Sequence, residues 1–186
     1  MRKLLLMFAI AAVPMLLHAR IGEDLKQCQA RYGKPIKEDL KKDISSKYAI
    51  FRKDAGDEAI FIKVAFSAET GKAYAVIYAK VDVVVFRNDS RMFENDKLSF
   101  NKIFSDDSTS SCKKFSKDEK EIFLKANYAG EWKEKAEGSE QKYLWQTGDN
   151  KMFAAQLGEN YNLFIIATDE LLNLNKKATK KAMSGF

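Results

Sequence analysis

Histidine is almost missing from this 186-residue sequence. The one histidine, His18, lies in a segment that we expect to be removed from the mature chain. Without histidine, Ser-His and Cys-His nucleophile pairs and histidine-containing zinc sites are excluded. General acid–base catalysis would have to use carboxylates, lysine or tyrosine. The sequence also has neither a GxGxxG motif nor a P-loop, so we expect no cofactor and no bound metal.

Long apolar runs are also rare, and the longest stands at the N-terminus. A basic start, Arg2-Lys3, precedes the mostly apolar residues 4–17, and the small Ala19 follows. This order predicts a signal peptide over residues 1–19. A membrane anchor is the alternative, but the run is short for a hydrocarbon core about 30 Å thick, and Pro14 interrupts it. We therefore expect an exported protein, periplasmic or secreted, with no transmembrane span after cleavage.

The body of the chain carries no excess of charge of either sign. The sequence has 32 basic and 26 acidic residues, and the surplus lies at the two ends, so that residues 20–175 are balanced. Nucleic-acid binding needs clustered lysine and arginine, so we expect no nucleic-acid partner. Residues 173–186 form a basic C-terminal tail, which we interpret as a solvated terminus. Contact of this tail with an anionic membrane surface is the alternative.

The pattern of the remaining residues predicts a single α+β domain over residues 20–172. We expect antiparallel sheet with short helices packed on one face. A first helix opens the mature chain and ends at Gly33, because glycine favours helix ends and Pro35 blocks continuation. A second helix is expected near residues 117–127, because Ser116 and Glu119 form a capping-box pattern.

Strands are predicted where apolar residues alternate, and they fall into two groups of three. The predicted strands are residues 47–53, 58–66, 72–86, 141–147, 151–157 and 161–168. Each group follows a helix at nearly the same spacing, which suggests an internal repeat of a helix plus three strands. The two halves would be residues 20–86 and 116–172, joined by the irregular connector 87–115. Convergence of simple α+β patterns is the alternative.

Alternation also predicts which side chains share a face of the sheet. We expect largely buried side chains at Ile60, Ile62, Val64, Phe66, Leu163 and Ile165. On the following strand, Tyr74, Val76 and Tyr78 are expected on one common face.

The candidate ligand-binding residues are Trp132, Tyr143 and Trp145. Aromatic side chains can stack on the apolar faces of a glycan or a peptide. Packing in the core or between strands is the alternative interpretation.

Carboxylates offer a second type of site. Asp106-Asp107 and Glu119 with Glu121 could serve a paired-acid mechanism, but no spacing singles them out, so we interpret them as solvated surface charges. The Gly148-Asp149-Asn150 segment resembles part of a calcium loop but lacks its alternating ligands, so we interpret it as a turn.

The two cysteines, Cys28 and Cys112, are the candidates for a disulfide. An even number of cysteines in an exported protein favours a bridge. Two buried thiols are the alternative, since Cys28 lies on the apolar face of the first helix. The bridge would require the central loop to fold back onto that helix.

The opening of the mature chain carries a family resemblance. Residues 20–35 include a Gly-Glu…Gln-Cys-x-Ala-Arg-Tyr-Gly-x-Pro pattern, which is similar to the start of a group of small, uncharacterised exported bacterial proteins. The segment 119–132 is similar to that group as well. More distantly, residues 22–35 resemble the Gly…Gln…Gly-x-Pro helix of the SmpA/OmlA outer-membrane-assembly lipoproteins and helices of β-lactamase-inhibitor-like proteins. These resemblances imply an α+β binding module.

Two functions remain as hypotheses from different classes. We expect an exported, non-enzymatic module that binds a protein or a cell-envelope component. The alternative is a carboxylate-dependent hydrolase of envelope polymers. The missing histidines and the lack of catalytic spacing favour the binding module.

Overall fold

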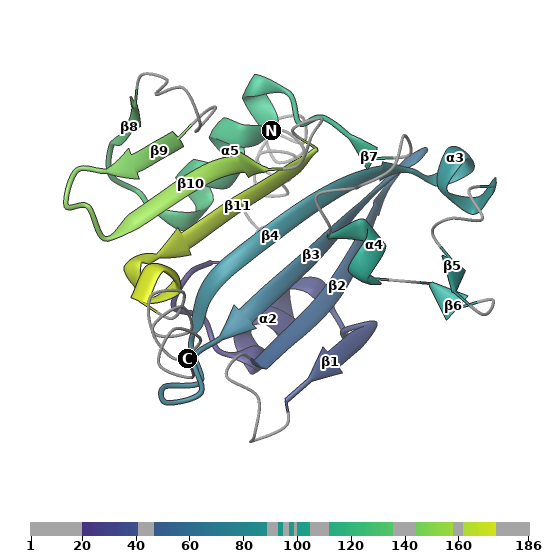
Figure 1. The fold of residues 1–186 in the computed structure, drawn as a ribbon, viewed down its shortest axis with the longest axis horizontal. Helices are drawn as coiled ribbons and strands as arrows, with labels where there is room; N and C mark the ends of the chain where they lie inside the picture. Colours follow the sequence, from purple (N-terminus) through teal and green to yellow (C-terminus); the bar gives the residue numbers. More distant parts are fainter. Residues whose placement is uncertain are drawn as a thin grey trace, which may run out of the picture.

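A large antiparallel sheet organises the protein (Figure 1). The computed structural model describes residues 20–40, 47–88, 93–94, 97–98, 100–104, 112–135, 144–157 and 162–173. Within these residues, the sheet has nine strands, and eight of them follow the order β1-β2-β3-β4-β11-β10-β9-β8. The ninth strand, β7, pairs with the end of β4, on the same edge of β4 as β11. The predicted signal peptide and Tyr143 lie outside the described residues.

The strand bounds show two meanders that meet at the β4–β11 pair. The first meander consists of β1 (Lys37–Asp39), β2 (Lys47–Ala55), β3 (Glu58–Phe66) and β4 (Ala73–Asp82). The second consists of β8 (Trp132–Lys135), β9 (Leu144–Thr147), β10 (Met152–Leu157) and β11 (Leu163–Thr168). The short strand β7 (Cys112–Lys113) pairs with the end of β4, and β5 (Phe93–Glu94) pairs with β6 (Lys97–Leu98) in a separate small sheet.

The two longest helices begin with capping boxes. Helix α2 (Leu25–Tyr32) is capped by Asp24 and Gln27, and α5 (Lys117–Asn127) by Ser116 and Glu119. In both, the N-cap side chain accepts a backbone N–H of the first turn, which satisfies a donor that has no partner inside the helix. Gly33 ends α2 with a φ of 84°, a conformation that favours glycine. Two short helices, α3 (Val83–Asn88) and α4 (Phe100–Ile103), lie between the meanders. Within the described residues, no helix is long and apolar enough to cross a membrane.

The mixed α+β fold is confirmed, and most strands lie where alternation predicts them. The long strand predicted over residues 72–86 is wrong at its end, because the chain turns into α3 after Asp82. The Asp82 carboxylate accepts hydrogen bonds from the backbone N–H groups of Val84 and Val85 at 3.0 and 3.1 Å. This capping starts a helix within a β-branched run that favours a strand by composition alone.

Both faces of the sheet carry packed side chains. Helices α2 and α5 cover one face, where a cluster forms from Cys28, Phe51, Ile62, Val64, Tyr78, Phe123 and Phe164. On the opposite face, Ile103 of α4 packs with Phe61 and Val81. The expectation of helices on one face therefore fits α2 and α5, whereas α4 departs from it.

The predicted core positions are buried at Ile62, Val64, Phe66, Leu163 and Ile165, while Ile60 is only half-buried. The expected common face of Tyr74, Val76 and Tyr78 is wrong at its first member. Val76 and Tyr78 lie under the helices, but Tyr74 packs in a separate cluster with Ile165. A register irregularity in the β3–β4 pair, between Ala65 and Phe66, interrupts the simple alternation.

The structure forms no bridge between Cys28 and Cys112, the two cysteines for which the sequence predicts a disulfide. Cys28 lies in the cluster under α2. Cys112 is paired with Val81 in the β7–β4 ladder, and directly opposed residues point to the same face. Cys112 and Val81 therefore lie on the face of Phe61, whereas Cys28 lies on the opposite face of the sheet.

Candidate functional site

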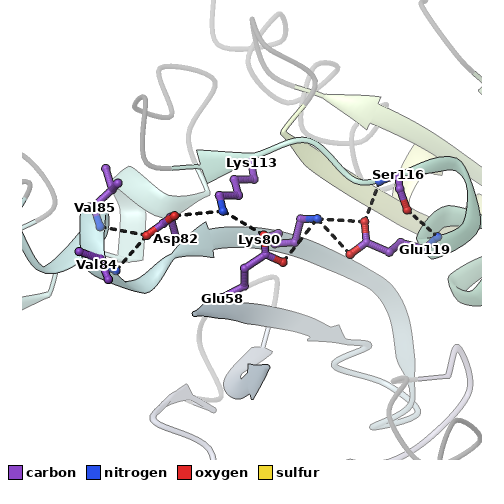
Figure 2. A network of polar contacts seen from close by, with 8 residues as sticks. All are labelled: Glu58, Lys80, Asp82, Val84, Val85, Lys113, Ser116 and Glu119. Atoms are coloured by element: carbon purple, nitrogen blue, oxygen red, sulfur yellow. Dashed lines mark hydrogen bonds and ion pairs between the residues drawn. The ribbon is translucent and has the colours of Figure 1, made fainter. Parts of the chain in front are cut away.

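Helix α5 is fixed to the sheet by an ion pair at its first turn (Figure 2). The Lys80 ammonium lies 3.0 Å from both carboxylate oxygens of Glu119, and the Lys80 residue is only 8% exposed. Glu119 also closes the capping box, because it accepts the Ser116 backbone N–H at 2.7 Å. The Glu119 carboxylate thus joins the start of α5 to strand β4 of the sheet.

The charges continue along the sheet as an alternating row, visible in Figure 2. Lys80 approaches Glu58 at 3.7 Å, and Lys113 bridges Glu58 and Asp82 at 3.0 Å each. The row therefore links β3, β4, β7 and α5, and each of its carboxylates faces a cation.

Two carboxyl groups of this row have lowered pKa values. Burial alone would raise the pKa of Glu119, but the Ser116 N–H and the Lys80 ammonium outweigh it and lower the pKa. The backbone N–H of Val85 and the Lys113 ammonium lower the pKa of Asp82. In turn, Asp82 and Glu58 raise the pKa of Lys113. These shifts favour the charged forms, as a structural ion-pair network requires.

A hollow of about 630 Å³ lies beside α5. We name it the α5–β9 hollow. It is lined by residues of α5, of the following connector and of β8 and β9: Lys117, Lys120, Glu121, Leu124, Lys125, Gly130, Glu131, Trp132, Glu134 and Trp145. Its volume falls in the range of about 300–1,000 Å³ that is typical of ligand sites.

Two of the three predicted aromatic residues, Trp132 and Trp145, line this hollow together. They lie on neighbouring strands, where Trp145 is directly opposite Glu134 in the β8–β9 register. Both are half-buried, so each indole has a packed side and a side open to solvent. Each of the two tryptophans thus contributes both to packing and to the surface of the hollow.

Each indole is held by a specific contact. The Trp132 Nε1–H donates to the Leu124 carbonyl oxygen at 3.0 Å, and its ring meets Tyr128 edge-to-face with centroids 6.1 Å apart. The Trp145 ring meets Phe164 of β11 edge-to-face, with centroids 5.7 Å apart. Such contacts fix the orientation of the rings before any ligand is present.

Gly130 shapes the rim of the hollow. A Cβ atom at this position would lie 2.4 Å from the Tyr128 Cε1 atom, which is closer than side-chain packing permits. Glycine therefore allows Tyr128 to lie over Gly130 and to support Trp132.

Lys120 extends from α5 across the hollow to the strands. Its ammonium lies 5.6 Å from the centre of the Trp145 ring and donates to the Gln156 Oε1 atom at 3.3 Å. Gln156 is itself 8% exposed. A cation held by an aromatic face and a buried amide is oriented at the surface of the hollow.

The candidate carboxylate pair is divided by the structure. Glu119 points to Lys80, whereas the exposed Glu121 lies 3.7 Å from Lys125 on the rim of the hollow. The two Glu side chains leave the helix on different sides, as positions two residues apart do. Asp106 and Asp107 lie outside the described residues.

The remaining candidates have structural roles in the described part of the chain. The Asp149 Oδ1 atom accepts from the Thr147 hydroxyl at 2.6 Å and from the Lys151 backbone N–H at 3.2 Å, so this segment is the predicted turn. Burial, aided by Glu23, raises the pKa of Cys28 to about 12, which keeps the thiol protonated. Among the described residues, no group of three acidic, thiol or imidazole side chains is placed to hold a metal ion.

No protein family, curated protein or solved structure matches this chain. The function must therefore be argued from the site itself.

Sequence reasoning found the two tryptophans but missed the lysines that share their hollow. Lys117, Lys120 and Leu124 recur at helical spacing within a helix that the capping box predicts correctly. The position of Lys120 beside Trp145 depends on how α5 packs on the sheet, which the local pattern does not encode.

Proposed function

We propose that the protein is an exported, non-enzymatic module that binds a protein or another envelope component in the α5–β9 hollow. The observation that carries the proposal is the pair of half-buried indoles, Trp132 and Trp145, in a hollow of ligand size. Rigid aromatic side chains bury a large area at low entropic cost, which is why they dominate binding hot spots. Export is proposed from the N-terminal signal pattern.

The carboxylates around the hollow suit binding better than hydrolysis. Glu121, Glu131 and Glu134 are all exposed, whereas a general acid is usually held in a buried, apolar environment. Glu119 is engaged by Lys80 and by its own capping box. Within the described residues, these features favour a charged rim over a paired-acid site.

We also propose that the domain consists of two related units, each a helix followed by a four-stranded meander. The support is the order of elements, α2 with β1–β4 and α5 with β8–β11, together with their mirrored order in the sheet. Both helices also start with a capping box. The second unit would then carry the hollow, as a specialised copy.

A pull-down from envelope extract tests the binding proposal. The mature protein, beginning at Arg20, is immobilised beside two variants, Trp145→Ala and Val84→Ala. Val84 is 60% exposed on α3 and serves as the control for loss of an exposed apolar side chain. We expect the wild type and Val84→Ala to retain the same partner and Trp145→Ala to lose it, with circular dichroism showing that all three are folded.

Two results would overturn the proposal. The first is a partner that binds Trp145→Ala as well as the wild type. The second is turnover of a glycan or peptide that disappears when one rim carboxylate is replaced. Detection of Met1 in the mature protein by intact-mass analysis would contradict the proposed export.

A further inference from the structure

The segment that opens the proposed mature chain is held in place by hydrogen bonds to two different elements. The Ile21 backbone N–H donates to the Asn127 Oδ1 atom of α5 at 3.0 Å. The Gly22 N–H donates to the Ala73 carbonyl oxygen of β4 at 2.8 Å, and the Ala73 N–H donates to the Glu23 carbonyl oxygen at 2.8 Å. The start of the mature chain is therefore fixed against both α5 and β4 before α2 begins.

The Glu23 carboxylate lies beside the first backbone nitrogen of this segment. The Glu23 side chain is only 12% exposed, and it forms an ion pair with Arg31 of the last turn of α2. The Arg20 backbone nitrogen lies 3.4 Å from the Glu23 Oε2 atom, which is long for a hydrogen bond from a peptide N–H. A positive charge on the same nitrogen would instead face the carboxylate at ion-pair distance, and such charge-assisted contacts are the stronger ones.

We infer that removal of the signal peptide gives Glu23 a second cation, the α-ammonium of Arg20, and that this ion pair fastens the start of the processed chain to α2. The inference rests on the proposed export and goes beyond it, because it assigns a structural role to the cleavage. Hydrolysis breaks the Ala19–Arg20 peptide bond: the OH of a water molecule joins the Ala19 carbonyl carbon, and its hydrogen joins the Arg20 nitrogen. At neutral pH the new acid loses a proton and the new amine gains one, since an α-amino group has an ordinary pKa of about 7.7–8.0.

The titratable side chains around Glu23 in the described part of the chain keep one protonation state near pH 8. Glu23 raises the pKa of Arg31, which stays charged. Burial raises the pKa of Cys28 to about 12, and it also raises the pKa values of Tyr32 and Tyr78. A change in stability near pH 8 that depends on Glu23 would therefore report the α-amine.

The direction of the pH dependence follows from the sign of the pair. Glu23 would raise the folded-state pKa of the α-amine above its value in the unfolded chain. The stabilisation is then fully present below about pH 7.7 and is lost as the pH rises through the folded-state pKa. The neighbouring Asp24 is itself paired with Lys72, at 3.2 Å, so it offers a matched control carboxylate.

Two chains with defined starts test the inference. The first begins at Arg20, and the second carries the tripeptide Ser-Ser-Ala ahead of Arg20, which moves the amine away by up to about 10 Å. Each chain is also made as Glu23→Gln and as the control Asp24→Asn, because asparagine caps a helix as well as aspartate does. Chemical denaturation at about pH 6.5 and about pH 10 gives the folding constants. The pKa of the α-amine is measured from the pH dependence of its acetylation, followed by mass spectrometry.

At about pH 6.5 we expect the chain that begins at Arg20 to have a folding constant about fivefold higher than the extended chain. This is the upper end of the range for exposed ion pairs, because the Glu23 side chain is mostly buried. The ratio should approach one at about pH 10, and it should be close to one in the Glu23→Gln chains at both pH values. The Asp24→Asn chains should keep the fivefold ratio at about pH 6.5.

Equal folding constants of the two unsubstituted chains at about pH 6.5 would overturn the inference, and so would a ratio that persists in Glu23→Gln or at about pH 10. If Glu23→Gln does not fold, the pKa of the α-amine decides: a value raised above that of the unfolded chain supports the ion pair, and an unchanged value overturns it. These ratios do not depend on export, because the starts of the chains are set by design. Intact-mass analysis tests the cleavage itself, and a mature protein that retains residues before Arg20 would overturn both the proposed export and this inference.

Discussion

The ion pair between Lys80 and Glu119 gives a quantitative test of how α5 is held in place. Replacing Glu119 by Gln removes the negative charge but keeps a side-chain oxygen that can accept the Ser116 N–H of the capping box. The substitution therefore isolates the interaction with Lys80, whose ammonium lies 3.0 Å from both carboxylate oxygens.

The expected cost follows from the burial of the two partners. Removing one partner of a fully buried pair costs about 3–5 kcal/mol. The Glu119 side chain is 31% exposed, and Glu58 at 3.7 Å still faces Lys80 in the variant. Both facts reduce the cost to about 2 kcal/mol, near the range for hydrogen bonds to charged groups. For a domain of this size, this lowers the Tm by about 4–8 °C.

Glu121→Gln is the matched control, because Glu121 lies on the same helix but is exposed. Its pair with Lys125 at 3.7 Å should contribute about 0.5 kcal/mol or less. Chemical denaturation of both variants and the wild type gives the unfolding free energies. If the two variants are equally stable at neutral pH, the ion pair does not hold α5 and the reasoning is refuted.

We also expect the difference in stability between the wild type and Glu119→Gln to depend on pH. The folded-state pKa of Glu119 lies below its ordinary value of 4.5. The stabilisation is therefore fully present above pH 4.5 and is lost as the pH falls through the folded-state pKa. The difference in unfolding free energy between the wild type and Glu119→Gln should shrink in this acidic window, and a difference that grows there would contradict the assigned direction.

Three further predictions concern packing. Gly130→Ala should shift the Trp132 indole N–H signal in NMR spectra, because the new Cβ would lie 2.4 Å from Tyr128, whereas Gly148→Ala meets no atom within 4 Å and should leave it unchanged. Cys28, fully buried with its pKa raised to about 12, should resist iodoacetamide at neutral pH until the protein unfolds; labelling as fast as in denaturant, measured by peptide mass spectrometry, would contradict its burial. Phe123→Ala removes the ring that stacks on Tyr78 with ring centroids 4.2 Å apart, and it should lower the free energy of unfolding by about 3–5 kcal/mol. The control Ile122→Ala, at an exposed position of the same helix, should lower it by about 0.5 kcal/mol. Similar losses for the two variants in chemical denaturation would refute the packing.

Local sequence patterns predicted the helix that has a capping box and the strand that has a regular apolar alternation. The Ser116 capping box predicts α5 over residues 117–127, as the structure has it. The alternation from Glu58 to Phe66 likewise predicts β3 with its observed bounds. In both cases, the residues that carry the signal lie within the element or directly before it.

The missed strands depend on pairing with a neighbouring strand rather than on their own residues. Strand β1 consists of Lys37-Glu38-Asp39, and β8 adds two lysines and a glutamate to Trp132. Neither has an apolar alternation, since each is an end strand of the sheet path, and charge is common on such strands. Only the pairing of β8 with β9 brings the predicted Trp132 beside Trp145, so the site could be named from sequence only as two separate aromatic residues.

Helix α5 explains why the ion-pair row and the hollow occur together. Its positions 119, 123 and 127 form one stripe that follows β4: Glu119 binds Lys80, Phe123 stacks on Tyr78, and the Asn127 amide reaches the Tyr78 hydroxyl at 3.5 Å. Residues 117, 120, 121 and 124 lie on the adjacent face, because helix positions three and four apart are neighbours. Once the first stripe is fixed to β4, the rotation of the helix is set, and the second face must point to β8 and β9. The charge pair with Lys80 therefore determines which lysines face Trp145.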